Sequence, residues 1–166
     1  MPRIMLSAIL CCAGLGGVSQ AGDVPDVKPG LWKTTTTTGD PNVPAQSGTM
    51  CTSTALLQTL FDQRLKDPAR PCKQTSVVHS GTTITEQTEC KFDGTVKRNK
   101  VVTVVSGDTE VRTEIHEEGK NTVTVSDSKW LSACPAGMQL GDFVGADGMK
   151  FNILHPENAR APAKAP

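Results

Sequence analysis

Residues 72–90 decide the fold of this chain. They read Cys72-Lys-Gln-Thr-Ser-Val-Val-His79, then Ser80-Gly81, then Thr82-Thr-Ile-Thr-Glu-Gln-Thr-Glu-Cys90. Cys72 and Cys90 are equally distant from Gly81, so a turn at this glycine places the two thiols opposite each other. Opposed residues of an antiparallel pair lie about 4.5–5.5 Å apart at their Cα atoms, within the range that a disulfide spans. The spacing therefore predicts a β-hairpin closed by a Cys72–Cys90 disulfide.

The residues that follow the hairpin read as further short strands. Residues 100–105, 109–116 and 121–131 are rich in Val and Thr, and glycine-containing turn signals separate them. In residues 109–116 the apolar and polar side chains alternate, which is typical of an antiparallel strand with one buried face. The expected buried face carries Val111, Thr113 and Ile115, and the expected solvent face carries Glu110, Arg112, Glu114 and His116.

The residues before the hairpin contain two strand patterns and one helical pattern. Residues 30–38 include a run of β-branched threonines that suits a half-buried strand, and residues 47–51 read as a second strand. Thr52-Ser53-Thr54 can then cap a helix, which we expect at about 54–66. Its apolar stripe at helical spacing consists of Leu56, Leu57, Leu60, Phe61 and Leu65.

The first 21 residues have the pattern of a secretory signal peptide. A positive start at Arg3 precedes an apolar and small-residue run, and Ser19-Gln20-Ala21 is a small-x-small cleavage site. We expect cleavage after Ala21 and a product without a transmembrane segment. Arg3 is the only charged residue of this leader, so its removal takes the net charge from 0 to −1. A nearly neutral chain gives no electrostatic reason to expect a nucleic-acid partner.

The cysteines that remain after cleavage are Cys51, Cys72, Cys90 and Cys134. An even number of cysteines in an exported protein favours disulfides. With Cys72 and Cys90 joined by the hairpin, Cys51 and Cys134 form the second pair. Zinc binding would require ligands at short spacings such as Cys-x-x-Cys, which this sequence does not contain. We expect no cofactor.

Taken together, the patterns predict a mainly β fold. We expect a single twisted or curled antiparallel meander sheet of about six to eight strands with one short helix packed on it, stapled by disulfides. The domain is expected over residues 22–154, with a small last hairpin turned by Asp147-Gly148. Residues 155–166 are rich in Ala and Pro and are expected to form a disordered tail.

Four short segments together resemble the bacterial exported proteins grouped as domain of unknown function 3617. These segments are Pro29-Gly30-Leu31-Trp32, Met50-Cys51, the Cys72…Cys90 hairpin, and Trp130-Leu-Ser-Ala-Cys134-Pro135. The resemblance covers residues 27–154 and departs from the family pattern at Ser132, where the family has a glycine. It implies export, a β-rich domain and paired cysteines. The family has no assigned activity, so the resemblance transfers no catalytic or binding residue.

A ligand pocket is the first candidate site. Trp32 and Trp130 are the only tryptophans of the chain, and either can line a hollow of the sheet or anchor its core. Leu57 and Phe61 of the expected helix can fill the concave side of the sheet or cover a pocket there. We therefore name Trp32, Leu57, Phe61 and Trp130 as pocket candidates.

Three polar groups are weaker candidates. Glu114, His116 and Glu118 form the densest polar cluster and are a possible metal site, although such alternation is ordinary on a solvated sheet face. His79 beside its turn is a candidate base without an evident nucleophile. The basic residues around 97–100 can meet an anionic partner or protect a strand edge from pairing.

The sequence contains no phosphate loop, Ser-His-Asp order or Gly-x-Ser-x-Gly elbow, so we assign no catalytic residue. We expect a non-enzymatic, monomeric module of the periplasm of a Gram-negative bacterium that binds an envelope partner or a small apolar ligand. Two alternatives stay open. One is a metal-dependent or hydrolytic enzyme that uses the His116 cluster, and the other is a structural protein of envelope stress that binds no ligand.

Overall fold

The computed structural model describes residues 24–66, 72–92 and 94–160. Over these residues the chain forms one helix and ten strands, and all ten strands belong to a single antiparallel sheet. The elements are β1 (Gly30–Thr37), β2 (Gln46–Thr52), α1 (Thr54–Lys66), β3 (Cys72–Ser80), β4 (Thr83–Phe92), β5 (Thr95–Ser106), β6 (Glu110–Glu117), β7 (Val123–Ser132), β8 (Asp142–Gly145), β9 (Lys150–Asn152) and β10 (His155–Arg160).

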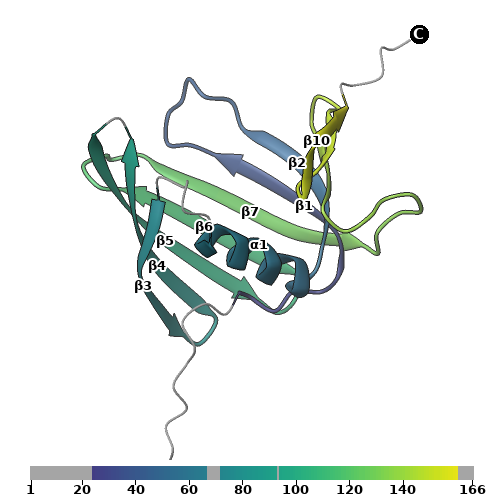
Figure 1. Ribbon diagram of the computed structural model, residues 1–166, viewed down its shortest axis with the longest axis horizontal. Coiled ribbons are helices and arrows are strands. Elements are labelled where there is room, and N and C mark those ends of the chain that lie inside the picture. The colour runs from purple at the N-terminus through teal and green to yellow at the C-terminus, as the bar shows by residue number, and fades with distance from the viewer. Residues whose placement is uncertain (1–23, 67–71, 93, 161–166) are drawn as a thin grey trace, which may run out of the picture.

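The strand order is β10-β9-β8-β2-β1-β7-β6-β5-β4-β3. The sheet curls, and α1 lies across its concave side (Figure 1). The predicted fold class is confirmed, but the predicted six to eight strands are too few, because the segment after Cys134 adds three short strands at one edge. The sheet is also not one continuous meander. Strands β3 to β7 follow one another, whereas β1 pairs with both β2 and β7.

The hairpin of β3 and β4 brings the predicted cysteines together, but a register shift between Gln74 and Ser76 is part of their pairing. Cys72 lies opposite Cys90, and the turn places Ser80 opposite Thr83 around Gly81, whose φ is +59°. A left-handed φ of this kind is accessible to glycine without steric cost. The two cysteines form a disulfide. The spacing of the thiols about Gly81 thus indicated the right pair, while the bulge in β3 compensates for a turn that is centred after Gly81.

Helix α1 crosses the sheet because the strands before and after it in the chain, β2 and β3, lie far apart in the sheet. It connects β2, in the middle of the sheet, to β3 at the far edge. Six strand spacings separate these strands, about 29 Å in a flat sheet. The 13 residues of α1 span only about 20 Å. The curl of the sheet shortens the remaining distance, so a helix on the concave side can bridge it.

Ser53 caps the N-terminus of α1. Its Oγ accepts a hydrogen bond of 3.3 Å from the backbone N–H of Leu56, one of the first-turn groups that lack a partner within the helix. Thr54 then fastens the helix to the preceding segment, because its Oγ1 donates to Asp26 Oδ1 at 2.8 Å and accepts from Val27 N at 2.9 Å.

Substitution Ser53→Ala is expected to lower the free energy of unfolding by about 1 kcal/mol, because the N–H of Leu56 loses its acceptor. Urea unfolding followed by circular dichroism measures the change. Thr59→Ala is the matched control, since the Thr59 hydroxyl bonds only the carbonyl of Ala55 inside the helix, at 2.9 Å. An equal loss of stability in both variants would contradict the capping role of Ser53.

The C-terminal part differs from its prediction. The hairpin at 147–148 is present as the connection between β8 and β9, and the rings of Phe143 and Phe151 pack across it with centroids 5.0 Å apart. Residues 155–160, where we expected the tail to begin, form β10 and pair with β9. The expected signal peptide and residues 161–166 lie outside the described residues.

Candidate functional site

A cavity of about 500 Å³ lies between α1 and the concave side of the sheet. Its size falls within the range of about 300–1,000 Å³ that is usual for small-molecule sites. Strands β1, β2, β5, β6 and β7 contribute its floor and α1 its roof, while Val24, Pro25, Val27 and Ile153 complete the lining. The cavity exists because α1 spans the hollow of a curled sheet instead of packing flat on it.

The roof of the cavity is apolar. Leu57, Leu60 and Phe61 follow one another at i, i+3 and i+4, so they lie on one face of α1 and line the cavity together. Leu56 of the predicted stripe is only 5% exposed but does not line the cavity. Gln63 lies near the end of this face and is exposed. On the sheet side, Trp32 and Met50 extend the apolar surface.

The floor of the cavity carries hydroxyl groups. Thr34 and Ser128 lie opposite each other on β1 and β7, with their hydroxyl oxygens 2.9 Å apart. Thr103 and Thr113 form a similar pair across β5 and β6 at 3.2 Å. All four residues line the cavity. The two walls therefore differ in chemistry: the helix offers hydrocarbon, and much of the sheet offers hydroxyl groups.

Thr52 adds a fifth hydroxyl residue to this lining, and it lies where β2 ends below the start of α1. Thr52 is 5% exposed, and its Oγ1 is buried without a hydrogen-bond partner among the described residues. A buried hydroxyl without a partner costs about 1–3 kcal/mol. Such an orphaned group beside a cavity is a recognised sign of a missing polar partner.

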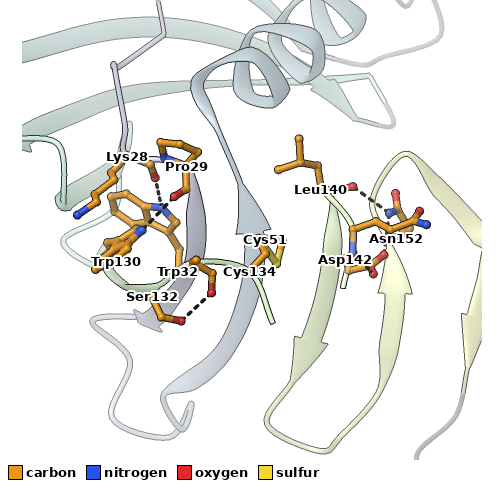
Figure 2. Close-up of a disulfide and its surroundings, with 12 residues drawn as sticks. Lys28, Pro29, Trp32, Cys51, Trp130, Ser132, Cys134, Leu140, Asp142 and Asn152 are labelled. Atoms are coloured by element: carbon orange, nitrogen blue, oxygen red, sulfur yellow. Dashed lines mark hydrogen bonds between the residues drawn. A yellow bond between two sulfur atoms is a disulfide. The ribbon is translucent and has the colours of Figure 1, made fainter. Parts of the chain in front are cut away.

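Of the four pocket candidates, the structure places Trp32, Leu57 and Phe61 in the cavity lining, but not Trp130. Trp32 is 3% exposed, and its Nε1 donates to the carbonyl of Lys28 at 2.9 Å. Figure 2 shows this bond beside the second indole.

Trp130 lies against the segment that precedes β1. Its Nε1 donates to the carbonyl of Pro29 at 3.2 Å, and the ammonium of Lys28 lies 3.9 Å from the centre of its ring (Figure 2). Trp130 lies directly opposite Trp32 in the register of β1 and β7, and that register shifts only before this pair, between Leu31 and Trp32. Gly30 permits the contact, because a Cβ there would clash with Ser132 O and Trp130 Nε1.

The Cys51–Cys134 disulfide fixes the junction of β2 and α1 (Figure 2). Cys51 is completely buried, and its carbonyl accepts a hydrogen bond from Gly141 N at 2.8 Å. The loop after Cys134 is held in turn by Asp142, whose carboxylate accepts from Gln139 N and from Asn152 Nδ2, both at 2.8 Å. These bonds, with that of Gln139 first, lower the pKa of Asp142. The end of the cavity near Thr52 is thus strongly anchored.

The predicted polar cluster of β6 is brought together only in part. His116 Nε2 lies 3.5 Å from Glu114 Oε2, but Glu118 pairs with Arg98 at 3.5 Å instead of joining them. Glu114 also accepts a bond of 3.1 Å from Arg112 Nε. No group of three or more potential metal ligands gathers anywhere in the part of the chain that the structure describes.

Two of the basic residues around 97–100, Lys97 and Arg98, have carboxylate partners. Lys97 pairs with Glu117 at 3.2 Å, and Arg98 pairs with Glu89 at 3.4 Å. These pairs match the interpretation of a charged strand surface more closely than that of a free cationic patch.

Further cations keep the same carboxylates ionised. The hydrogen bond from Lys73 is the main cause that lowers the pKa of Glu89, and the hydrogen bond from Lys120 is the main cause that lowers that of Glu117. The negative charges that face the basic residues are therefore present at neutral pH.

His79, the candidate base, lies on β3 opposite Ile84 and does not line the cavity. Its Nε2 is buried and has no hydrogen-bond partner among the described residues. No described nucleophile is bonded to it, so we assign it no chemistry.

Sequence reasoning missed the hydroxyl floor. The run from Thr34 to Thr38 was interpreted as strand material only, although Thr34 shares the period-2 face of Trp32. Ser128 and Thr113 likewise share one face with Val111 across β6 and β7. The signal was the alternation of Thr and Ser on the face that also carries the candidate apolar residues.

Searches of curated proteins and of solved structures gave no significant match. No helix among the described residues is both long and apolar enough to cross a membrane. A family model described as "Protein of unknown function (DUF3617)" matches residues 27–134, which span β1 to β7, α1 and all four cysteines of the two disulfides. The chain belongs to this family.

Proposed function

We propose that this protein binds a small, largely apolar ligand in the cavity between α1 and the sheet. The observation that carries the proposal is the cavity itself, about 500 Å³ with a continuous apolar roof formed by Leu57, Leu60 and Phe61. Small-molecule sites are usually concave and lined mainly by apolar side chains, and this space has both properties. Its hydrocarbon roof favours an apolar occupant.

The construction of the site also supports binding without catalysis. The cavity has a buried tryptophan, Trp32, in its wall and a disulfide-anchored helix above it, which gives a preformed pocket. The titratable cluster of Glu114 and His116 lies on β6 but outside this lining. We infer a carrier or sensor of a small molecule.

The disulfides support a location in an oxidising compartment. With the signal-peptide pattern of residues 1–21, we propose the periplasm of a Gram-negative bacterium. An apolar ligand in that compartment has to be shielded from water between membranes. A cavity roofed by a helix supplies this shielding.

Substitution Val111→Phe tests the site. Val111 lines the cavity from β6, so a larger side chain there occupies ligand space without removing a hydrogen bond. The affinity for diphenylhexatriene, a fluorescent hydrocarbon, is expected to fall roughly tenfold or more, because the ligand and the new ring compete for one volume. A fluorescence titration measures the dissociation constant.

Val104→Phe is the matched control. Val104 follows the cavity residue Thr103 on β5, so its side chain points to the opposite face of the sheet. This variant is expected to bind the dye as the wild type does. Equal dye affinity in the wild type and Val111→Phe, or no binding by the wild type, would overturn the proposal.

A further inference from the structure

We infer that the ligand is an uncharged amphipathic molecule, whose hydroxyl or carbonyl oxygen faces the hydroxyl groups of the sheet while its hydrocarbon part lies against α1. This inference rests on the function proposed above and adds the chemical class of the ligand. It follows from three features of the cavity: the absence of charge in its described lining, the spare hydrogen-bonding capacity of its floor, and the orphaned hydroxyl of Thr52.

The first feature is the lack of charge. Among the residues that the structure describes, those that line the cavity include no Asp, Glu, Lys, Arg or His. A charged group that enters an apolar site without a partner pays a large desolvation cost. A carboxylate, phosphate or ammonium on the ligand would find no opposite charge among these described residues. This part of the lining therefore disfavours ionised ligands.

The second feature is the capacity of the paired hydroxyl groups. In the pair of Thr34 and Ser128, one hydroxyl donates to the other at 2.9 Å. Each hydroxyl group has one proton and two acceptor lone pairs, so the accepting member of the pair keeps its own proton. The pair of Thr103 and Thr113 has the same capacity. The floor can thus donate to a ligand oxygen and accept from a ligand hydroxyl.

The third feature is Thr52. Its hydroxyl is buried and has no described partner, although the residue lines the cavity. A threonine side chain has staggered χ1 positions that exchange its methyl and hydroxyl groups. Rotation about χ1 presents the Thr52 hydroxyl to an oxygen of the ligand. The hydrogen bond that forms would remove the free-energy cost of burying this hydroxyl without a partner. An entirely apolar ligand would leave that cost in place.

The experiment compares two probes with the same hydrocarbon chain, 1-decanol and decanoate, at pH 7.5. Each displaces diphenylhexatriene from the wild-type protein, and the loss of dye fluorescence gives its affinity. Decanoate is ionised at this pH. We expect 1-decanol to bind at least roughly tenfold more tightly, because the carboxylate has no charge partner among the described residues of the lining. This comparison requires no variant to fold.

Two variants then locate the polar contact. The double variant Thr34→Val with Ser128→Ala removes both members of one hydroxyl pair, so no partner is left orphaned. It is expected to lower the affinity for 1-decanol roughly three- to tenfold and to leave the affinity for diphenylhexatriene unchanged. Thr52→Val is expected to do the same. The control Thr35→Val lies on the opposite face of β1 and should change neither affinity.

The outcomes separate this inference from the proposed function. If the dye binds but decanoate matches 1-decanol, or neither probe displaces the dye, the inference is wrong and the apolar site stands. The same conclusion follows if 1-decanol binds every hydroxyl-deleted variant as it binds the wild type. If the dye does not bind the wild type, the proposed function fails and the inference fails with it.

Discussion

Replacing Cys51 and Cys134 together by alanine is expected to lower the free energy of unfolding by about 4.5 kcal/mol. The two residues are 83 positions apart, and the cost of closing a loop of this length in the unfolded chain gives this value. Against a total stability of about 5–15 kcal/mol for a typical domain, the loss is large. Urea unfolding of the oxidised proteins, with the midpoint and slope fitted together, measures it.

The Cys72→Ala with Cys90→Ala variant is the matched control. This pair closes a separation of 18 residues, for which the same relation gives about 3 kcal/mol. The first variant should also lose dye binding, because Cys51 immediately precedes Thr52 and the start of α1. A greater loss of stability from the hairpin pair would contradict the anchoring role that we assign to the Cys51–Cys134 bond.

Substitution Trp32→Ala is expected to destabilise the protein by about 3–5 kcal/mol, as for other large buried aromatic residues. Trp32 is 3% exposed and forms part of the cavity wall, and its Nε1 satisfies the carbonyl of Lys28. Removal of the indole enlarges the cavity and leaves that carbonyl without its donor. Urea unfolding measures the change in stability.

Trp130→Ala is the corresponding control on the paired strand. Trp130 is half-buried and does not line the cavity, and it makes a hydrogen bond to the carbonyl of Pro29 and a contact with the ammonium of Lys28. Loss of these contacts is expected to cost about 1–2 kcal/mol. Equal destabilisation by the two alanine variants would contradict the larger contribution to stability that we assign to the buried Trp32 in the cavity wall.

The features that local sequence decides were predictable. The spacing about Gly81 indicated the Cys72–Cys90 hairpin, although not its bulge, and α1 has the bounds that its cap and apolar stripe indicated. The alternation of β6 holds only in part: Val111 and Thr113 line the cavity, but Ile115, which we predicted on the same buried face, is 37% exposed. Each of these signals is contained within about twenty residues of sequence.

The features that depend on distant pairing were not predictable in the same way. The insertion of β1 between β2 and β7 brings Thr34 beside Ser128, 94 residues further along the chain. No local pattern specifies that neighbour, so the hydroxyl floor could not be assembled from sequence. The same pairing sets Trp130 opposite Trp32, yet Trp130 contacts Lys28 and Pro29 and does not line the cavity.

The central claim is that a ligand binds beside Trp32 beneath α1, and a single-tryptophan protein tests it most directly. Trp130→Phe leaves Trp32 as the only tryptophan, and the chain has no tyrosine, so its emission reports on the cavity alone. On titration with diphenylhexatriene we predict saturation at one dye per chain, with the Trp32 emission quenched by energy transfer in parallel. An unchanged Trp32 emission at saturating dye, or no saturable binding, would contradict the account.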